Sequence, residues 1–325
     1  MPNKYPEKKG WNVPKQKYKV SNWTDYTESL RQRGNITVWL SEDAIAQWYE
    51  ADRVYDGSGT PRLYTNFAII TCHEIRLVYK LPLRQCQGFI DSLFQLMKIS
   101  LSCPDFSVLS KRLGQLNIKV PRYKKTDNPD DGIHAIAIDS TGLKRFGRGE
   151  WHQEKYKLSS KASWRKLHLA INQEHYIEAC TLTDRFSHDD QQVEGLLEQI
   201  ADSIDHFSAD GAYDETPVYN AVTAHSPDAD VVIPPRVNAV ENDKAASLRN
   251  RTIIEIDTMG RMPWQKTRQY GRRNYSELGV QRYQRTFGDA MHARDFVRQQ
   301  QEAMLASGAL NKMTSLGMPK SHRSA

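Results

Sequence analysis

IHAIAID, residues 133–139, is the stretch that decides the fold: five apolar residues and a histidine lead to a terminal aspartate. A nearly continuous apolar run of this length is typical of a strand that is buried on both faces of a sheet. We expect Asp139 to be the last residue of this strand and to emerge at the edge of the sheet. A rigid strand would then present a carboxylate to solvent.

The segments that follow continue the sheet. RKLHLAINQE (165–174) and HYIEACTLTD (175–184) alternate apolar and polar residues around a turn at 172–175, which predicts an antiparallel hairpin. Next come an amphipathic helix (189–202), a short strand (206–210), a helix (214–225) and a strand (229–235) that two prolines end. With a long helix beginning near Tyr275, this order predicts the α/β class, specifically an RNase H-like mixed sheet flanked by helices.

Three carboxylates fall at informative positions in this arrangement. Asp139 and Asp210 each end a predicted strand, and Glu277 lies near the start of the last helix. Neighbouring parallel strands would bring the two aspartates within a few ångströms, a repulsion that a divalent cation usually relieves. Taken singly, an aspartate at a strand end is more often a turn former. The combination is what favours a catalytic site.

The ligand chemistry indicates which metal to expect. Carboxylate oxygens without thiolates suit Mg²⁺, for which Mn²⁺ can substitute. Two such ions in one active site activate the attacking oxygen and stabilise the leaving oxygen of a phosphodiester. Gln281, Gln284 and Arg285 follow Glu277 by four, seven and eight residues and so share its helix face. A basic residue on that face could approach a phosphate.

The N-terminal part of the chain predicts helices. Residues 1–65 are expected to form an arm or accessory segment, with a short helix that Ser41 caps. Residues 66–120 predict three helices with short connections, which is compatible with a helix-turn-helix-like DNA-binding domain. Its candidate DNA contacts are Arg84, Lys111 and Arg112. Any small helical bundle shows the same apolar stripe, so that alternative stays open.

The remaining boundaries follow from composition. Residues 121–132, with two prolines and several charges, predict a linker. The catalytic domain is expected over 133–310 with an insertion at 236–268, and a tail over 311–325. Arg165 and Lys166, at the start of a predicted strand, are candidate phosphate contacts.

Composition restricts the partners. The 45 Lys and Arg residues against 39 Asp and Glu give a net charge of +6, and basic clusters favour a polyanion, although solvated faces would look the same. No apolar run reaches the roughly 18 residues of a membrane helix, and we expect a cytoplasmic protein with no membrane partner.

The four cysteines form no Cys-x-x-Cys pair and are expected to be reduced core residues. The absence of a glycine-rich phosphate loop argues against a nucleotide cofactor.

Three blocks of sequence carry a resemblance to a known family. They are IAIDSTGLK (136–144), FSADGAYD (207–214) and YGRRNYSELGVQRYQ (270–284). The chain resembles the DDE transposases of bacterial insertion sequences, most closely family five and also family four. Tyr270, Arg273 and Glu277 match the YREK signature of these families. The signature lysine falls on Gln284, and the resemblance leaves open whether Arg282 or Arg285 supplies its charge.

The resemblance implies a function. Such an enzyme binds the terminal inverted repeats of a mobile element in double-stranded DNA, cleaves the element ends and joins the 3′-hydroxyl to target DNA. By family analogy, Tyr270 and Arg273 would contact DNA near the cleaved bond. A homodimer on DNA is expected because two element ends must be held together.

Two groups of lesser candidates have simpler interpretations. His168 lies on a predicted strand among apolar neighbours, which favours a structural histidine. His188, Asp189 and Asp190 lie where a helix is predicted to begin, which favours capping over metal binding.

Two other functions remain compatible with the residues alone. One is a DNA-binding regulator that has lost catalysis, as the departure at Gln284 would allow. The other is a general RNase H-like nuclease. Metal-independent binding without strand scission would favour the first, and cleavage without sequence preference the second.

Overall fold

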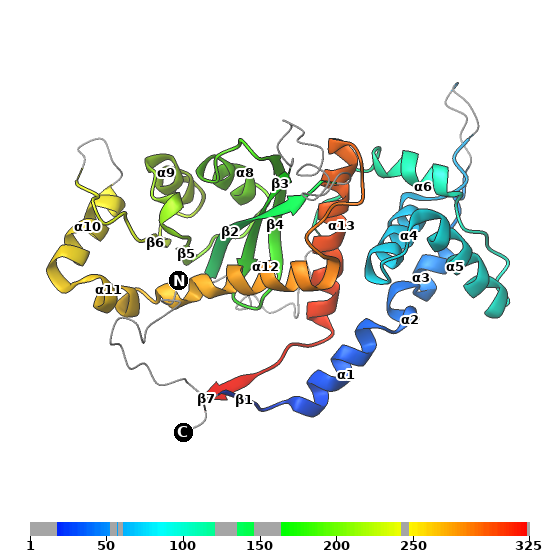
Figure 1. The fold of residues 1–325 in the computed structure, drawn as a ribbon, viewed down its shortest axis with the longest axis horizontal. Coiled ribbons are helices and arrows are strands. Elements are labelled where there is room, and N and C mark those ends of the chain that lie inside the picture. Colours follow the sequence, from blue (N-terminus) through cyan, green and yellow to red (C-terminus); the bar gives the residue numbers. More distant parts are fainter. Residues whose placement is uncertain are drawn as a thin grey trace, which may run out of the picture.

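A five-stranded mixed sheet forms the centre of the chain (Figure 1). This computed structural model describes residues 18–52, 57, 61–120, 135–145, 164–241 and 247–323. The strands lie in the order β4-β3-β2-β5-β6, where β2, β3 and β4 are antiparallel and β5 and β6 run parallel to β2. Their bounds are β2 Ala135–Lys144, β3 Trp164–Asn172, β4 Ile177–Asp184, β5 His206–Ser208 and β6 Asp230–Val232. Three antiparallel strands followed by two parallel ones confirm the RNase H-like class.

The central strand is longer than its sequence predicted. The expectation that the strand ends at Asp139 is wrong, because β2 continues to Lys144. Its pairing with β3 runs along the whole length, so the strand has a partner beyond the aspartate. The predicted hairpin of β3 and β4 is confirmed, and its turn is fixed by Asn172, whose Oδ1 accepts hydrogen bonds from the backbone N–H groups of Glu174 and Tyr176.

Helices cover the sheet and extend from it. The helix expected over 189–202 is shorter, with a 3₁₀ turn η3 at Asp190–Gln192 and α8 at Val193–Leu197. The long helix near Tyr275 is present as α12 (Asn274–Phe287), and α13 (Phe296–Ser315) runs through the boundary expected at 310. The others in this half are η4 Gly211–Tyr213, α9 Thr216–His225, α10 Ser247–Met259, α11 Arg261–Thr267 and η5 Tyr270–Arg273.

Residues 66–120 form the three predicted helices, which are α4 (Asn66–Val78), α5 (Leu83–Leu96) and α6 (Phe106–Leu113). Before them lie α1 Trp23–Arg33, α2 Ile36–Trp39 and α3 Glu42–Ala46, of which the sequence predicted only the last. Ser41 caps α3, since its Oγ accepts a hydrogen bond from the Ala44 N–H. The expected linker at 121–132 lies outside the described residues.

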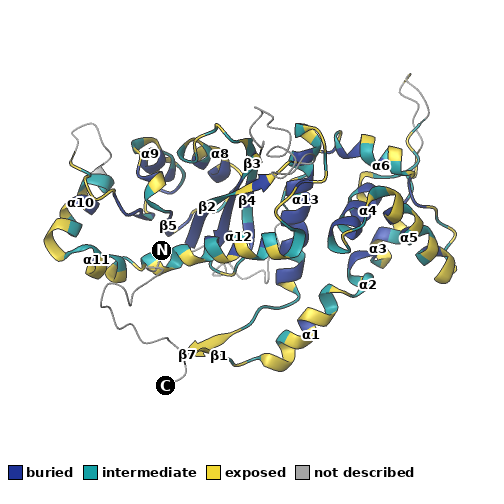
Figure 2. Cartoon of the chain, in the orientation of Figure 1, coloured by how far each residue is buried: buried dark blue, intermediate teal, exposed yellow. Residues whose placement is uncertain are grey.

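Two hydrophobic clusters cover opposite faces of the sheet. Side chains that alternate along β3 separate them, because Leu169 and Ile171 belong to one cluster and Ala170 to the other. The cluster around Ala170 packs against α8 and α9. The cluster around Leu169 contains α13 and also the helices α4, α5 and α6. The N-terminal helices and the sheet therefore share one core, with α13 between them (Figures 1 and 2).

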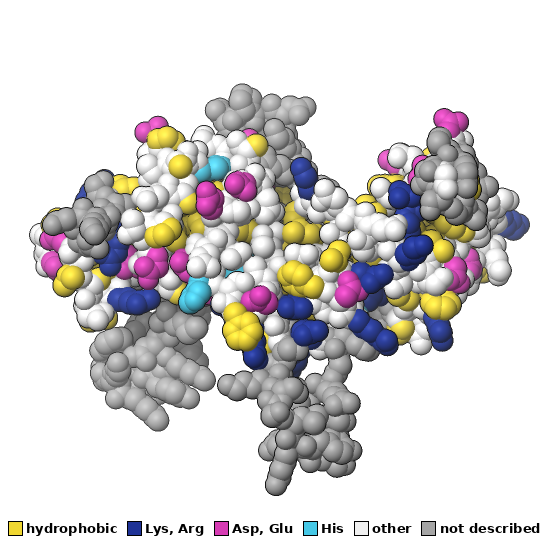
Figure 3. All heavy atoms as spheres, turned by 90° about the horizontal axis from the view of Figure 1, so that it is seen from above, with side chains coloured by type: hydrophobic (Ala, Val, Ile, Leu, Met, Phe, Trp, Pro, Cys, Tyr) yellow, Lys and Arg dark blue, Asp and Glu magenta, His cyan; other side chains and the backbone are white. Residues whose placement is uncertain are grey.

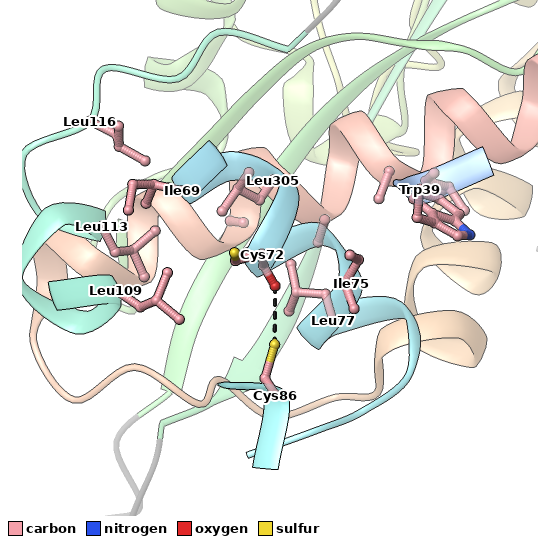
Figure 4. Packing of buried hydrophobic residues seen from close by; sticks show 14 of the residues in the cluster. Trp39, Ile69, Cys72, Ile75, Leu77, Cys86, Leu109, Leu113, Leu116 and Leu305 are labelled. Carbon is pink, nitrogen blue, oxygen red and sulfur yellow. Dashed lines mark hydrogen bonds between the residues drawn. The ribbon is translucent and has the colours of Figure 1, made fainter. Parts of the chain in front are cut away.

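The shared core is built closely around α4. Leu305 of α13 packs near Cys72 of α4, with Leu109 and Leu113 of α6 beside them (Figure 4). The Cys86 thiol donates a hydrogen bond to the Cys72 carbonyl at 3.4 Å. All four cysteines are buried free thiols, which confirms their predicted role.

The ends of the described chain lie together. Strand β1 (Tyr18–Val20) pairs antiparallel with β7 (Ser321–Arg323), to the left of α1 in Figure 1. Among the described residues, every helix is too short or too polar to span a bilayer.

Candidate active site

The register of two parallel strands brings Asp139 and Asp210 to the same level of the sheet. The last residue pair between β2 and β5 is Ala137 with Ser208. Each aspartate follows its paired residue by two positions, on strands that lie about 4.8 Å apart. Strand β5 ends at Ser208, so Asp139 lies beyond the last residue pair between the two strands. The two carboxylates therefore share one edge, although Asp139 is in the middle of its own strand.

Local hydrogen bonds hold each aspartate in place. The Ser140 N–H donates to Asp139 Oδ1 at 2.8 Å, and the Ala212 N–H donates to Asp210 Oδ1 at 2.8 Å. Asp210 thereby caps η4, so it is a turn former as well as a site residue. Each carboxylate keeps a second oxygen that these bonds do not use.

Helix α12 carries Glu277 across the sheet to the same edge. Gly279 allows the close approach, since a Cβ there would lie 1.7 Å from Ile171 Cδ1 on β3. Gln284, at the position of the signature lysine, donates a hydrogen bond to Thr141 Oγ1 at 2.8 Å. That residue thus fixes the helix to β2, a role that the sequence did not suggest.

Arg273 lies between two members of the acidic trio. Its guanidinium forms a short ion pair with Glu277 and approaches Asp139 Oδ2 at 3.7 Å. The side chain is only 11% exposed. Tyr270 lies beside it, with the Arg273 guanidinium carbon 5.9 Å from the ring centroid. The cation is positioned to offset part of the negative charge.

The three carboxylates influence one another electrostatically. The pKa of Asp139 is raised to about 6, mainly by burial, with smaller contributions from the negative charges of Asp210 and Glu277 and opposing effects of the Ser140 N–H and Arg273. Burial also raises the pKa of Tyr270. These are the shifts expected where like charges gather in a partly closed cleft.

One cleft contains the trio together with Tyr270, Arg273, Gln281 and Gln284. Arg236 and Arg261 also line it. The sequence analysis missed these two because they lie in the segment taken as an insertion. Their positions carried a signal: Arg236 comes directly after the prolines that end β6, at the same edge of the sheet as Asp210.

Asp189 has a role that the sequence analysis assigned wrongly. It was expected to cap a helix, yet its side chain makes no capping hydrogen bond. Instead, Lys166 and Ser140 donate to its two oxygens at 2.9 and 3.1 Å. His168 Nδ1 lies 3.8 Å from the same carboxylate, while Nε2 pairs with a threonine hydroxyl, so His168 is structural as expected. The network supports the residue next to Asp139.

Several predicted DNA contacts lie elsewhere. Arg112, a candidate DNA contact, was expected on the surface of its helix, which is wrong: it is 7% exposed and donates to Tyr64 O and Asn66 Oδ1. Arg282 also cannot replace the signature lysine, because it donates to His175 O and Thr314 Oγ1. Arg285 is exposed but does not line the cleft.

The remaining candidates are also outside the cleft. Arg165 stacks on Phe296 at 4.5 Å and donates to Gln299, so it faces α13. Lys166 is paired with Asp189. Arg84 and Lys111 are exposed on the N-terminal helices, with Arg84 stacked over Phe106.

The donor set fits a hard divalent cation. Three carboxylates and no thiolate line the cleft, and the hydrogen bonds from Ser140 and Ala212 leave each aspartate a second oxygen, which in Asp139 faces the Arg273 guanidinium at 3.7 Å. Within the described part of the chain, no three acidic, histidine or cysteine side chains are already arranged as an ion cage. Arg273 accounts for this in the trio, since its guanidinium lies between Glu277 and Asp139.

Comparison with known proteins identifies the family of the chain. Residues 131–312, more than half of the chain, match a family model described as the transposase DDE domain. The chain belongs to this family. A second model with the same description matches residues 31–148, which include the N-terminal helices and β2.

A solved structure is also similar. It is described as the cryo-EM structure of the piggyBac transposase synaptic complex with hairpin DNA, at 10% identity and a TM-score of 0.39, and the match covers 87% of this chain and 73% of that one. Membership of the transposase DDE domain family implies, in general terms, an enzyme that cleaves DNA with divalent metal ions.

Proposed function

We propose that the chain is the transposase of a bacterial insertion sequence, related to families five and four, that cuts the ends of its element and inserts them elsewhere. One observation carries the proposal. Asp139 lies within β2, Asp210 follows the end of β5 and Glu277 lies on α12, and the three line one cleft with Tyr270 and Arg273.

The reaction consists of two phosphoryl transfers at one site. In the first, a water oxygen attacks phosphorus and the P–O3′ bond at the element end breaks, which leaves a 3′-hydroxyl. In the second, that hydroxyl attacks a phosphodiester of target DNA and displaces the target 3′-oxygen. Two Mg²⁺ ions, for which Mn²⁺ can substitute, would be held by the three carboxylates and would activate the attacking oxygen and stabilise the leaving one.

The chain's own residues bind and orient the DNA strand. Arg273 has a planar guanidinium that suits a phosphate, and it would release Asp139 and Glu277 as it turns to the strand. Arg236 and Arg261 extend the positive wall of the cleft. Tyr270 supplies an aromatic face beside the arginine. A homodimer would hold both element ends.

Cleavage of a defined substrate tests the proposal. The substrate is a duplex with the inverted repeats that flank the coding region, incubated with purified protein and Mg²⁺. Cleavage should disappear in Asp139→Asn, Asp210→Asn and Glu277→Gln, while DNA binding persists. Asp228→Asn, a change at an exposed aspartate outside the cleft, is the matched control and should cleave normally.

Other outcomes would assign a different function. Full cleavage by any of the three variants would remove that residue from the site. Binding without scission by the unchanged protein would indicate a regulator. Equal cleavage of scrambled duplexes or of RNA–DNA hybrids would indicate a general nuclease.

A further inference from the structure

A second hollow lies between the N-terminal helices and the start of α13, apart from the cleft. Its walls are the α4–α5 turn and α6 on one side and residues 292–298 on the other. The cationic side chains that line it are Arg76, Lys80, Lys111, Arg294 and Arg298, against a single acid, Asp295. None of the catalytic trio is part of it.

The single acid does not neutralise the groove. Asp295 forms a short ion pair with Arg298 and caps α13 by accepting a hydrogen bond from the Arg298 N–H. Its charge is therefore matched by that of Arg298. Lys80 and Lys111 are exposed, and neither forms an ion pair with another described residue. A polyanion would meet uncompensated charge here.

Lys80 is held at the groove by its backbone conformation. Its φ is 54°, in the left-handed region that glycine usually occupies after a helix. The Leu81 N–H donates to Arg76 O at 2.9 Å across this turn, which ends α4. The turn places the Lys80 side chain at the wall of the groove.

The two walls are tied together. Arg298 Nε donates a hydrogen bond to Ser110 O, which joins the start of α13 to α6. The Arg298 side chain also lies against Gly114, within 3.4 Å of the position of a Cβ. The groove is thus preformed, and its cations do not need a rearrangement of the helices to face one ligand.

We propose that this groove binds the sugar–phosphate backbone of duplex DNA outside the catalytic cleft. The inference goes beyond the proposed function. It rests on that function only because the function identifies DNA as the ligand. Several cations along a hollow suit a chain of phosphates better than one small anion. Figure 3 shows Lys and Arg side chains gathered on the right half of one face, where the N-terminal helices meet the rest of the chain.

The proposal gives α6 a different role from the one its sequence predicted. A recognition helix presents several side chains to base edges in the major groove. Helix α6 has eight residues, and its Arg112 is buried in hydrogen bonds to the protein. It forms one wall of a backbone-binding groove, so its contacts carry no sequence preference.

The test measures binding without metal, so that it does not depend on cleavage. The full chain and Lys80→Gln/Lys111→Gln are titrated with fluorescent duplexes in EDTA over a series of salt concentrations. One duplex carries the inverted repeats and the other a scrambled sequence. The double variant should bind both more weakly by the same factor. The slope of log K against log salt should fall by about 1.8, because each phosphate that a lysine no longer neutralises lowers it by about 0.9.

A matched control separates the groove from general charge. Lys98 is also exposed and left-handed, with φ 56°, but does not line the groove, and Lys98→Gln should bind like the unchanged protein. An unchanged affinity and an unchanged slope of log K against log salt in the double variant would overturn the proposal. Cleavage by the unchanged protein would still support the proposed transposase function. Weaker binding of the inverted-repeat duplex alone would overturn it in favour of base recognition. A thermal melt confirms that each variant is folded.

Discussion

Arg273 and Glu277 form an ion pair one turn apart along the chain, and the same guanidinium reaches Asp139 on the central strand. This arrangement places a fixed cation among three carboxylates. It ties the helix that carries one acid to the strand that carries another. The site is thereby held together by a charge that DNA phosphates can compete for.

Arg273→Lys should reduce the rate of DNA cleavage by about 10- to 100-fold. A lysine retains the charge but presents one ammonium group, so it cannot contact two carboxylates or a phosphate through a planar fork. The loss corresponds to one charged hydrogen bond, about 1.5–3 kcal/mol. Single-turnover cleavage of the inverted-repeat duplex measures it. Arg272→Lys is the control next to it, and equal rates for both variants would show that charge alone suffices at position 273.

Asp139→Asn should raise the stability of the metal-free protein at neutral pH. The folded-state pKa of Asp139 is raised to about 6, above the unfolded value near 4. The folded state therefore favours the neutral carboxyl of Asp139. The contribution of this neutral group to the stability of the protein is fully present below pH 4 and is lost as the pH rises through 6. A gain of about 2–3 kcal/mol at pH 7.5 follows, since a difference of one in pKa corresponds to about 1.4 kcal/mol.

Thermal melts in EDTA at pH 4 and pH 7.5 measure the effect. The difference between Asp139→Asn and the unchanged protein should shrink at the lower pH. A variant that is less stable at pH 7.5 would contradict the argument.

Gly279→Ala should destabilise the fold by about 1–3 kcal/mol. The added methyl would lie 1.7 Å from Ile171 Cδ1, in a side chain that is fully buried. Ile171→Val removes that carbon, so Gly279→Ala/Ile171→Val should be more stable than the sum of the two single effects predicts. Urea unfolding of all four proteins gives the coupling. Additive effects would mean that α12 shifts away from β3 instead.

Asp189→Ala should cost about 1–3 kcal/mol, because it leaves the partly buried Ser140 hydroxyl without its acceptor and Lys166 without its charged partner, with only the Ser187 carbonyl left to accept from Lys166. Asp190→Ala, one residue further on, should stay within about 0.5 kcal/mol of the unchanged protein. Chemical denaturation compares the two. If both variants were equally stable, the carboxylate of Asp189 would have no part in supporting the strand.

Much of the sheet could be predicted from local patterns. The apolar run before Asp139, the alternation along 165–184 and the prolines after Ile233 each specify a strand without reference to the rest of the chain. The cleft around Asp139, Asp210 and Glu277 also follows, because strand order sets which residues share an edge. The strands depend on residues that are close in sequence, and the cleft depends on the order of the strands in the sheet.

What could not be predicted depends on contacts between distant segments. The continuation of β2 past Asp139 comes from its pairing with β3, and the burial of Arg112 comes from hydrogen bonds to Tyr64 and Asn66, over 40 residues away. Asp189 looked like a capping residue because acids commonly begin helices. Only the fold shows that Lys166 lies opposite it.

The packing of α13 has a mechanical consequence. Its apolar side chains, Leu305 among them, are covered by the N-terminal helices on one side and the sheet on the other. Separating the N-terminal helices from the sheet would expose this interface to water, at a cost of about 25 cal/mol for each square ångström of apolar surface. The N-terminal helices and the sheet therefore move as one rigid body. A duplex bound to these helices would be held in a fixed orientation relative to the cleft that Asp139, Asp210 and Glu277 line.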